Sequence, residues 1–450
     1  MDPNKQVPVT PAQAIRQAEA ATEAAARQAE HEAAAAEAGK NDYEQNAKHG
    51  EDIINELQTQ IDNPTPFVST GFNVLDVVLG DGDESGGLPP GLITLGAIPS
   101  LGKSTLALQI ADNIANSGRD VLIIALEMTV YELAARSVSR LTAELAAHPG
   151  NSPQDYKNAL APADRTPGLA LTARGVRLFK SRRKRDEEKS PNAAVMNHWR
   201  EAEEILNKSI KAYSEIAPHL YIYVPRTQVK PERIVNITKA HIDRARKENP
   251  TTPPPIILVD YMQIMAPSDV HQSEKANMDT ATLMLKHLAR DYNTSVIAIS
   301  SFNRMNYKEV VSMEAFKESG GIEYSSDIAI AMQLYGTGMA GKNETLDIEF
   351  EKTRNPRRIQ AKILKNRDGR TGQYINLEYY APFNLFVEAQ DKPSLFFTDV
   401  PEHWKAEPPK MKADEARGKE PRTQEPAVDI SGLMPGNQAK EKKKTKPGKV

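Results

Sequence analysis

The 450-residue chain contains no cysteine. This absence excludes disulfide bonds, thiolate zinc sites and cysteine nucleophiles, and it fits a reducing compartment such as the cytoplasm. Long apolar runs are also absent, and no charged start followed by an apolar stretch stands at the N-terminus. We therefore expect a cytoplasmic protein with no membrane-spanning helix and no secretory signal.

An excess of charge of either sign is missing as well. The formal net charge is -3 at neutral pH, so the overall charge does not indicate nucleic-acid binding. Any DNA site must then be a local basic surface, because such binding depends on where the cations lie.

Composition divides the chain into three regions. Residues 1–65 are rich in Ala and Glu, with a short helical stretch near Ile53–Gln60, and are expected to form a helical or partly disordered extension; a partner-binding helix is the alternative. Residues 66–390 are expected to form the compact domain. Residues 391–450 are rich in Pro, Lys and Glu and are expected to be a disordered basic tail with, at most, weak attraction to DNA.

Apolar strands alternate with amphipathic helices in the compact region. This alternation predicts an α/β fold with a mostly parallel, twisted sheet covered by helices on both faces. The clearest strands are expected at Leu92–Ala97, Val121–Leu126, Ile256–Asp260 and Val296–Ser300. The helices are expected at Ser104–Ser117, Val130–Leu145, Pro231–Lys247 and Asn277–Asp291. Hairpin-like strands are expected at Leu346–Glu351, Ala361–Lys365 and Tyr374–Tyr379.

Residues 148–218 interrupt the alternation and are interpreted as an insertion. They contain a basic cluster, Lys180–Arg185, and a helical run from Trp199 to Tyr213. The cluster could contact phosphates, but acidic residues follow it directly, so a solvated charged helix is the favoured interpretation.

The segment from Ala97 to Ser104, called the phosphate loop below, lies between a predicted strand and a predicted helix. This context is the one that phosphate-binding loops require. Backbone N–H groups around Gly102 and the start of the helix offer an anion site, Lys103 would reach the outer phosphates, and Ser104 would hold Mg²⁺. The expected nucleotide contacts are Ala97, Pro99, Ser100, Leu101, Gly102, Lys103, Ser104 and Thr105.

Two carboxylates follow other predicted strands. Asp260 ends the apolar run Ile256–Val259, at the edge where open α/β sheets bind ligands, and would support Mg²⁺; a helix cap is the alternative. Glu127 follows the strand after the phosphate-loop helix and could polarise an attacking water, although exposed glutamates are common.

These segments together resemble the RecA-type ATPase domain of DnaB-type replicative helicases, from about Phe67 to Glu388. The phosphate loop resembles the family's A-R-P-S-M-G-K-T, which has alanine where other families have the first glycine. The other matching segments are Leu126–Met128 for L-E-M, Val259–Gln263 for V-D-Y-L-Q, Glu318–Glu323 for E-S-G-A-I-E and Lys365–Gly369 for K-Q-R-N-G.

The resemblance implies a RecA-like P-loop NTPase with a C-terminal β-hairpin extension, using ATP and Mg²⁺. It implies that Glu127 is the catalytic base, that Arg136 packs on adenine, and that Lys365 and Arg367 reach the γ-phosphate held by a neighbouring subunit. It also implies a homo-oligomer, in this family a hexameric ring, with single-stranded DNA in the channel. The expected DNA contacts are Arg304, Lys317, Glu318, Ser319 and Gly320.

The spacing of Lys365 and Arg367 supports an anion contact on its own. Side chains two apart on a strand share a face, and an arginine supplied in trans stabilises the charge of phosphoryl transfer. The alternative is an exposed basic edge strand that discourages aggregation.

Two features depart from the family pattern. Ser301 stands where the family has a glutamine that links the γ-phosphate to the DNA loop, so we expect altered coupling. The stretch before Phe67 is too short and too polar to form the family's N-terminal collar domain, so a shortened form is expected. Whether a helicase loader or primase is a further partner stays open.

The sequence therefore predicts a ring-forming, ATP-dependent DNA helicase or translocase on single-stranded DNA, acting in the replication of a chromosome or a mobile element. Two alternatives remain: a recombination ATPase similar to RadA, and an ATP-binding helicase-assembly factor that does not unwind DNA.

Overall fold

In the computed structural model, the described residues are 37, 40, 47–82, 86–147, 169–265, 267–269, 271–303, 307–316, 319–339, 344–389, 394 and 399–413. The chain divides into two units, Met1–Phe67 and Val68–Val450, which are treated separately. Within the described residues, no helix combines the length and apolar character needed to cross a membrane.

The first unit contains α2, Gly50–Asp62, which confirms the helix predicted near Ile53–Gln60. Its apolar side chains Ile53, Leu57 and Ile61 are exposed at helical spacing. Nearly all of the predicted Ala- and Glu-rich stretch before it lies outside the described residues.

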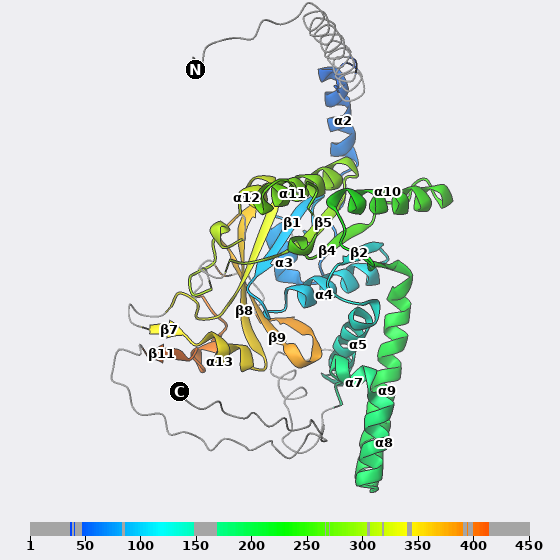
Figure 1. The fold of residues 1–450 in the computed structure, drawn as a ribbon, viewed down its shortest axis with the longest axis vertical. Helices are drawn as coiled ribbons and strands as arrows, with labels where there is room; N and C mark the ends of the chain where they lie inside the picture. The colour runs from blue at the N-terminus through cyan, green and yellow to red at the C-terminus, as the bar shows by residue number, and fades with distance from the viewer. Residues whose placement is uncertain are drawn as a thin grey trace, which may run out of the picture. The chain divides into compact units, whose positions relative to one another are not determined.

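The second unit is built on a nine-stranded sheet in the order β10-β9-β8-β6-β1-β5-β4-β2-β3 (Figure 1). The six strands from β6 to β3 are parallel, and β8, β9 and β10 continue the sheet in antiparallel pairings. The parallel strands are β6 Ile328–Leu334, β1 Gly91–Ala97, β5 Ser295–Ser301, β4 Ile256–Asp260, β2 Val121–Ala125 and β3 Leu220–Tyr223. The antiparallel strands are β8 Arg357–Asn366, β9 Tyr374–Tyr380 and β10 Leu385–Glu388. This arrangement confirms the predicted mostly parallel sheet and its hairpin extension.

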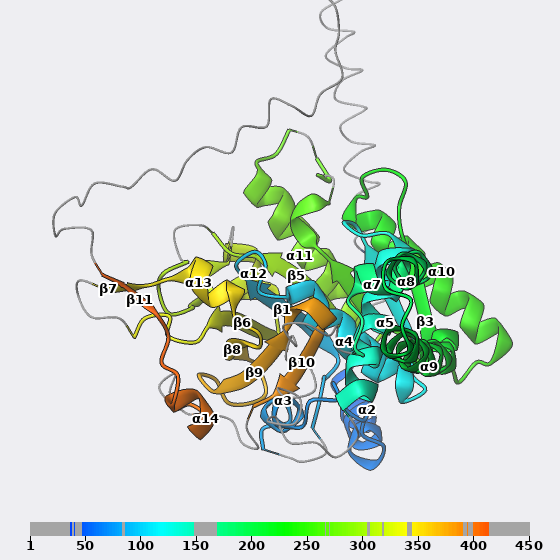
Figure 2. The ribbon, with the colours of Figure 1, turned by 90° about the horizontal axis from the view of Figure 1, so that it is seen from below.

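Helices cover both faces of the sheet because alternate residues of each strand point to opposite sides. Leu92 of β1 packs in a cluster with α10 and α11, whereas Ile93 packs in another with α3 and α4. In Figure 2, α11 lies above the strands and α3 below them. These helices are α3 Asn73–Leu79, α4 Lys103–Asn116, α10 Pro231–Glu248 and α11 Glu274–Asp291, and α5 Val130–Ala147 packs beside α4.

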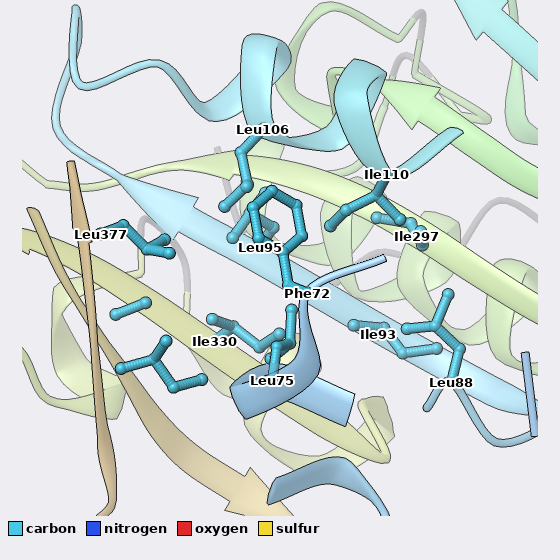
Figure 3. Close-up of a pocket in the computed structure, with 12 residues that line it drawn as sticks. Phe72, Leu75, Leu88, Ile93, Leu95, Leu106, Ile110, Ile297, Ile330 and Leu377 are labelled. Carbon is cyan, nitrogen blue, oxygen red and sulfur yellow. The ribbon is translucent and has the colours of Figure 1, made fainter. Parts of the chain in front are cut away.

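The core on the α3 side retains a small, wholly apolar cavity of about 20 Å³. Phe72 projects into it between Leu75 of α3 and Leu106 and Ile110 of α4, over strand residues that include Ile93 (Figure 3). Because no polar group lines it, the cavity is a packing gap in the core and offers no anchor for a polar ligand.

The stretch interpreted as an insertion, residues 148–218, contains α7 Ala173–Arg177, α8 Phe179–Lys189 and α9 Ala193–Ile216. Phe179 meets Trp199 edge to face at 5.3 Å between ring centroids, which fixes α8 against α9. In the basic cluster, Arg183 pairs with Glu187 and Glu203, and Lys184 and Arg185 also have acidic partners. This internal pairing supports the interpretation as a solvated charged helix.

Two expectations about the C-terminal part differ from the structure. The strand expected at Leu346–Glu351 is not formed beyond Leu346: β7 spans Glu344–Leu346, and Asp347 caps the short helix α13, Ile348–Thr353. Within the tail expected to be disordered, residues 399–413 contain α14, Glu402–Lys405, and β11, Met411–Ala413, whereas residues 414–450 lie outside the described residues and stay a prediction. Trp404 is buried there and donates its Nε1–H to Glu378 at 3.1 Å, so one aromatic side chain orders a stretch of polar composition. The second unit also contains the short helix α12, Ser319–Ser325, before β6.

Candidate nucleotide site

The phosphate loop leaves β1 at Ala97 and enters α4 at Lys103. Gly102 sits at the helix N-cap with φ of 90°, in the left-handed region that favours glycine. A Cβ on Gly102 would also lie 2.8 Å from the rings of both Phe386 and Tyr379, so the loop can pack on these aromatic rings only with glycine there. Ser100 takes a positive φ of 68° in the same loop.

Lys103 lies in the pocket as a cation that could bind an anion. Its Nζ donates to the Ala97 carbonyl at 3.0 Å, and none of the described carboxylates forms an ion pair with it. Burial lowers the pKa of Lys103 to about 8, although the Asp260 and Glu127 carboxylates act in the opposite direction. A bound polyphosphate would supply the negative charge that this buried ammonium lacks.

Ser104 and Asp260 come together across the sheet. The Ser104 hydroxyl donates to Asp260 Oδ1 at 3.0 Å, and β4 places Asp260 beside Ala125 at the end of β2. Burial raises the pKa of Asp260 to about 6; the Ser104 hydrogen bond lowers it, and the Glu127 carboxylate raises it further. A hydroxyl and a carboxylate at this edge are the ligand types that Mg²⁺ takes beside phosphates.

Glu127 and Arg136 line the same cavity, which has a volume of about 600 Å³. The other members of the predicted nucleotide set that line it are Pro99, Ser100, Gly102, Lys103, Ser104 and Thr105. Ala97 and Leu101 are fully buried and support the loop from behind. One pocket therefore combines two predicted cations, Lys103 and Arg136, with the Ser104–Asp260 pair and the Glu127 carboxylate.

Sequence reasoning missed several residues that line this pocket, among them Arg357 and Tyr379, which contact the phosphate loop or each other. Arg357, at the start of β8, donates to the Ser100 carbonyl at 2.7 Å and lies over the Tyr379 ring at 5.6 Å. Burial lowers the pKa of Arg357. The sequence gives little indication that Arg357 and Tyr379 belong to the pocket, because only the antiparallel pairing of β8 with β9 brings them to the phosphate loop.

Lys365 and Arg367 do not line this pocket. Lys365 pairs with Ala329 near the start of β6, whereas Ala97, where the phosphate loop begins, pairs with Met332 further along. Lys365 Nζ donates to the Glu323 carbonyl at 2.6 Å, and Arg367 lies 3.3 Å from Asp327. The pair is thus at the opposite end of the sheet from its own phosphate loop.

The predicted DNA contacts are only partly described. Arg304, Lys317 and Glu318 lie outside the described residues. Ser319 begins α12, and a Cβ on Gly320 would lie 3.5 Å from Lys275 Cε of α11. Ser301 lines the nucleotide pocket, and its backbone N–H donates to Gln263 Oε1 at 3.3 Å. A glutamine amide is therefore present beside Ser301, although it comes from another segment.

The fold and pocket define a RecA-like α/β domain with a phosphate loop. A solved ATPase domain superposes with a TM-score of 0.52 at 19% identity, over 76% of this chain and 99% of that one. A solved DnaB-like replicative helicase, described with its interactions with primase, gives a TM-score of 0.50 at 18% identity, over 76% of this chain and 67% of that one.

The chain belongs to the DnaB-like helicase C-terminal domain family, whose model matches residues 68–151 and 193–388. The replicative DNA helicase DnaB of Helicobacter pylori is 23% identical over 366 residues, 75% of this chain and 62% of the relative. A probable replicative DNA helicase of Trieres chinensis is 24% identical over 344 residues, 75% of this chain and 60% of the relative. The chain therefore spans less than two thirds of each relative. A shorter match joins 69 residues, 15% of this chain, to the Campylobacter jejuni DNA repair protein RadA at 43% identity.

Proposed function

We propose that this protein is a subunit of a ring, expected to be a hexamer, that hydrolyses ATP at its subunit interfaces. The ring uses the energy of hydrolysis to move along single-stranded DNA and to unwind duplex DNA in replication. One observation carries the proposal. Lys103, Ser104, Glu127 and Asp260 share one pocket, while Lys365 and Arg367 lie at the far end of the sheet. A second copy of the chain could supply these cations to the pocket.

The described side chains fit Mg²⁺ and a nucleotide. Ser104 and Asp260 would hold the ion, which when bound neutralises charge on the phosphate oxygens. Lys103 grips the outer phosphates, and Arg136, on the pocket wall, supports the base. Glu127 accepts a proton from the attacking water, while Lys365 and Arg367 of a neighbouring copy stabilise the developing charge.

Single-stranded DNA is proposed as the polymer on which the ring acts. The start of α12, around Ser319 and Gly320, can present backbone N–H groups to phosphates, with Lys275 beside Gly320 as a cation. Contacts of this kind read the DNA backbone, so no sequence preference is expected.

A recombination ATPase similar to RadA is the second candidate, favoured by the short match to the RadA protein of Campylobacter jejuni. The match covers 15% of this chain, whereas the helicase family model matches residues 68–151 and 193–388. Strand exchange without unwinding would support this candidate.

The ATPase rate with and without single-stranded DNA, measured beside unwinding of a forked duplex, tests the proposal. Stimulation by DNA and unwinding are both expected, and both should vanish in Lys103→Ala. Turnover that does not respond to DNA would contradict the proposal. Binding of ATP without turnover would instead support an assembly factor.

A further inference from the structure

Asp327, the residue directly before β6, forms ion pairs with two cations, Lys286 and Arg367. Its Oδ1 pairs with Lys286 Nζ of α11 and with Arg367 Nη1 at 3.3 Å. Burial lowers the pKa of Lys365, and the charges of Arg367, Asp327 and Lys286 also act on it, so Lys365 lies close to all three. The cluster of these side chains therefore joins the two residues proposed to act on a neighbour's phosphate to a carboxylate and a third cation.

Asp327 is fixed in position by the backbone around it. Its Oδ2 accepts the Leu92 N–H of β1 at 2.8 Å, and its own N–H donates to the Leu92 carbonyl at 2.8 Å. Gly91 leaves room for the carboxylate, because a Cβ on Gly91 would lie 2.6 Å from Oδ2. The carboxylate consequently cannot follow Arg367 if that side chain moves.

The two cationic partners of Asp327 differ in exposure. The Arg367 side chain is 55% exposed, whereas Lys286 is 20% exposed and Asp327 only 10%. The exposed Arg367 side chain can leave Asp327 for a ligand, while the more buried Lys286 stays in place. A largely buried carboxylate with no partner would be costly, so the inner lysine keeps Asp327 compensated when Arg367 departs.

We propose that Asp327 is a positioning residue that holds Arg367 in the free subunit, and that Lys286 is the counterion that allows Arg367 to leave for the neighbour's phosphate. The inference rests on the proposed function, because it assigns a use to the trans role of Arg367. Lys286 thereby sets how readily the arginine is released.

The contacts of Asp327 predict the effect of removing the charge of Lys286. Among the residues that the structure describes, Arg367 is then the one remaining ion-pair partner of Asp327. Their attraction strengthens, so the equilibrium between held and released Arg367 shifts toward the held side chain. Release is needed only for turnover, so nucleotide binding in the pocket of the same subunit should not change.

The test is steady-state ATPase kinetics of the full chain with single-stranded DNA. Lys286→Met is expected to lower kcat roughly fivefold, the upper range for a partly exposed pair, with KM for ATP unchanged. Adding Asp327→Asn to Lys286→Met is expected to restore kcat, because a neutral amide no longer retains the guanidinium. Because Asp327→Asn also removes the buried charge that Lys286 compensates, the unfolding midpoint is measured for the same variants. A purely structural role for Lys286 predicts that the midpoint falls and recovers together with kcat, whereas the release role predicts recovery of kcat without a matching change in the midpoint.

Lys352→Met is the matched control, because Lys352 is 19% exposed and likewise pairs with a carboxylate, that of Glu349. It should keep the wild-type kcat. Lys286→Gln, which keeps a hydrogen-bond donor without the charge, should show the same loss as Lys286→Met and guards against a folding defect. An unchanged kcat in both Lys286 variants, or a loss that Asp327→Asn does not rescue, overturns the inference. Full activity of Arg367→Ala would instead overturn the proposed function.

Discussion

The Ser104 hydroxyl donates a hydrogen bond to Asp260 at 3.0 Å, although 156 residues separate the two along the chain. Parallel strands make this contact possible, because β1 and β4 end at the same edge of the sheet with β5 between them. The pair joins the first turn of α4 to the only acidic residue of β4. Hydrolysis should therefore depend on both residues through the bound metal ion.

Asp260→Asn is expected to raise the Mg²⁺ concentration that supports half-maximal ATPase activity. Because the carboxylate charge at the metal position is lost, the increase should be at least about tenfold. A magnesium titration of the ATPase rate measures it. Ser104→Ala should raise that concentration as well. Ser117→Ala, at the C-cap of α4, is the control for the loss of a serine hydroxyl and should leave the titration unchanged.

The lowered pKa of Lys103 predicts proton uptake when ATP binds without metal. The pKa is about 8 in the free protein, and a bound polyphosphate raises it because it favours the ammonium. The contribution of the charged Lys103 to the free energy of ATP binding is then complete below pH about 8, and it is lost as the pH rises through the pKa of the bound state. In the presence of a chelator, the affinity for ATP should therefore fall as the pH rises from about 8 through the pKa of the bound state.

Titration calorimetry in two buffers of different ionisation enthalpy measures this uptake directly. Near pH 8, the apparent binding enthalpy should differ between the buffers for the wild type. Lys103→Met, which has no titrating amine, should bind more weakly and with the same enthalpy in both. Equal enthalpies for the wild type would show that Lys103 is already fully charged before binding.

Arg357→Met should weaken nucleotide binding without unfolding the domain. The substitution removes the hydrogen bond to the Ser100 carbonyl, and a bond from a charged donor contributes about 1.5 kcal/mol or more, close to tenfold in affinity. Equilibrium binding of a fluorescent ATP analogue measures the change. Lys362→Met on the same strand, where Lys362 lies over the Tyr374 ring, is the matched control and should bind normally.

Phe72→Ala should destabilise the second unit by about 3–5 kcal/mol, because it enlarges an existing apolar cavity that water cannot fill favourably. Denaturant unfolding measures the loss. Phe350→Ala is the control: Phe350 is 38% exposed, and its contacts with Arg354 and Lys410 are worth at most about 1 kcal/mol each. Similar losses in the two variants would mean that Phe72 does not support the core.

The central strands and the phosphate loop could be predicted because their signals are local. Four apolar residues ending in Asp260 indicate a buried strand whatever surrounds them, and glycine at position 102 followed by Lys103 and Ser104 defines a loop by spacing alone. The predicted strand at Ile256–Asp260 matches β4 residue for residue.

Contacts made by pairing or docking could not be predicted in the same way. Arg357 reaches Ser100 only after β8 has joined the sheet, and Trp404 becomes buried only when its polar segment meets Glu378. Likewise, the spacing of Lys365 and Arg367 predicts a shared face, but nothing local in the sequence indicates that Asp327 and Lys286 meet Arg367 there.

Mixing two inactive variants tests the central claim, hydrolysis completed by a neighbour, most directly. Lys103→Ala should lose nucleotide binding, and Arg367→Ala should lose roughly three orders of magnitude or more in turnover. When the two are mixed and reassembled with single-stranded DNA, intact pockets of the Arg367→Ala subunits should meet intact arginines of the Lys103→Ala subunits, and ATPase activity should return. A mixture as inactive as its two components would contradict the account.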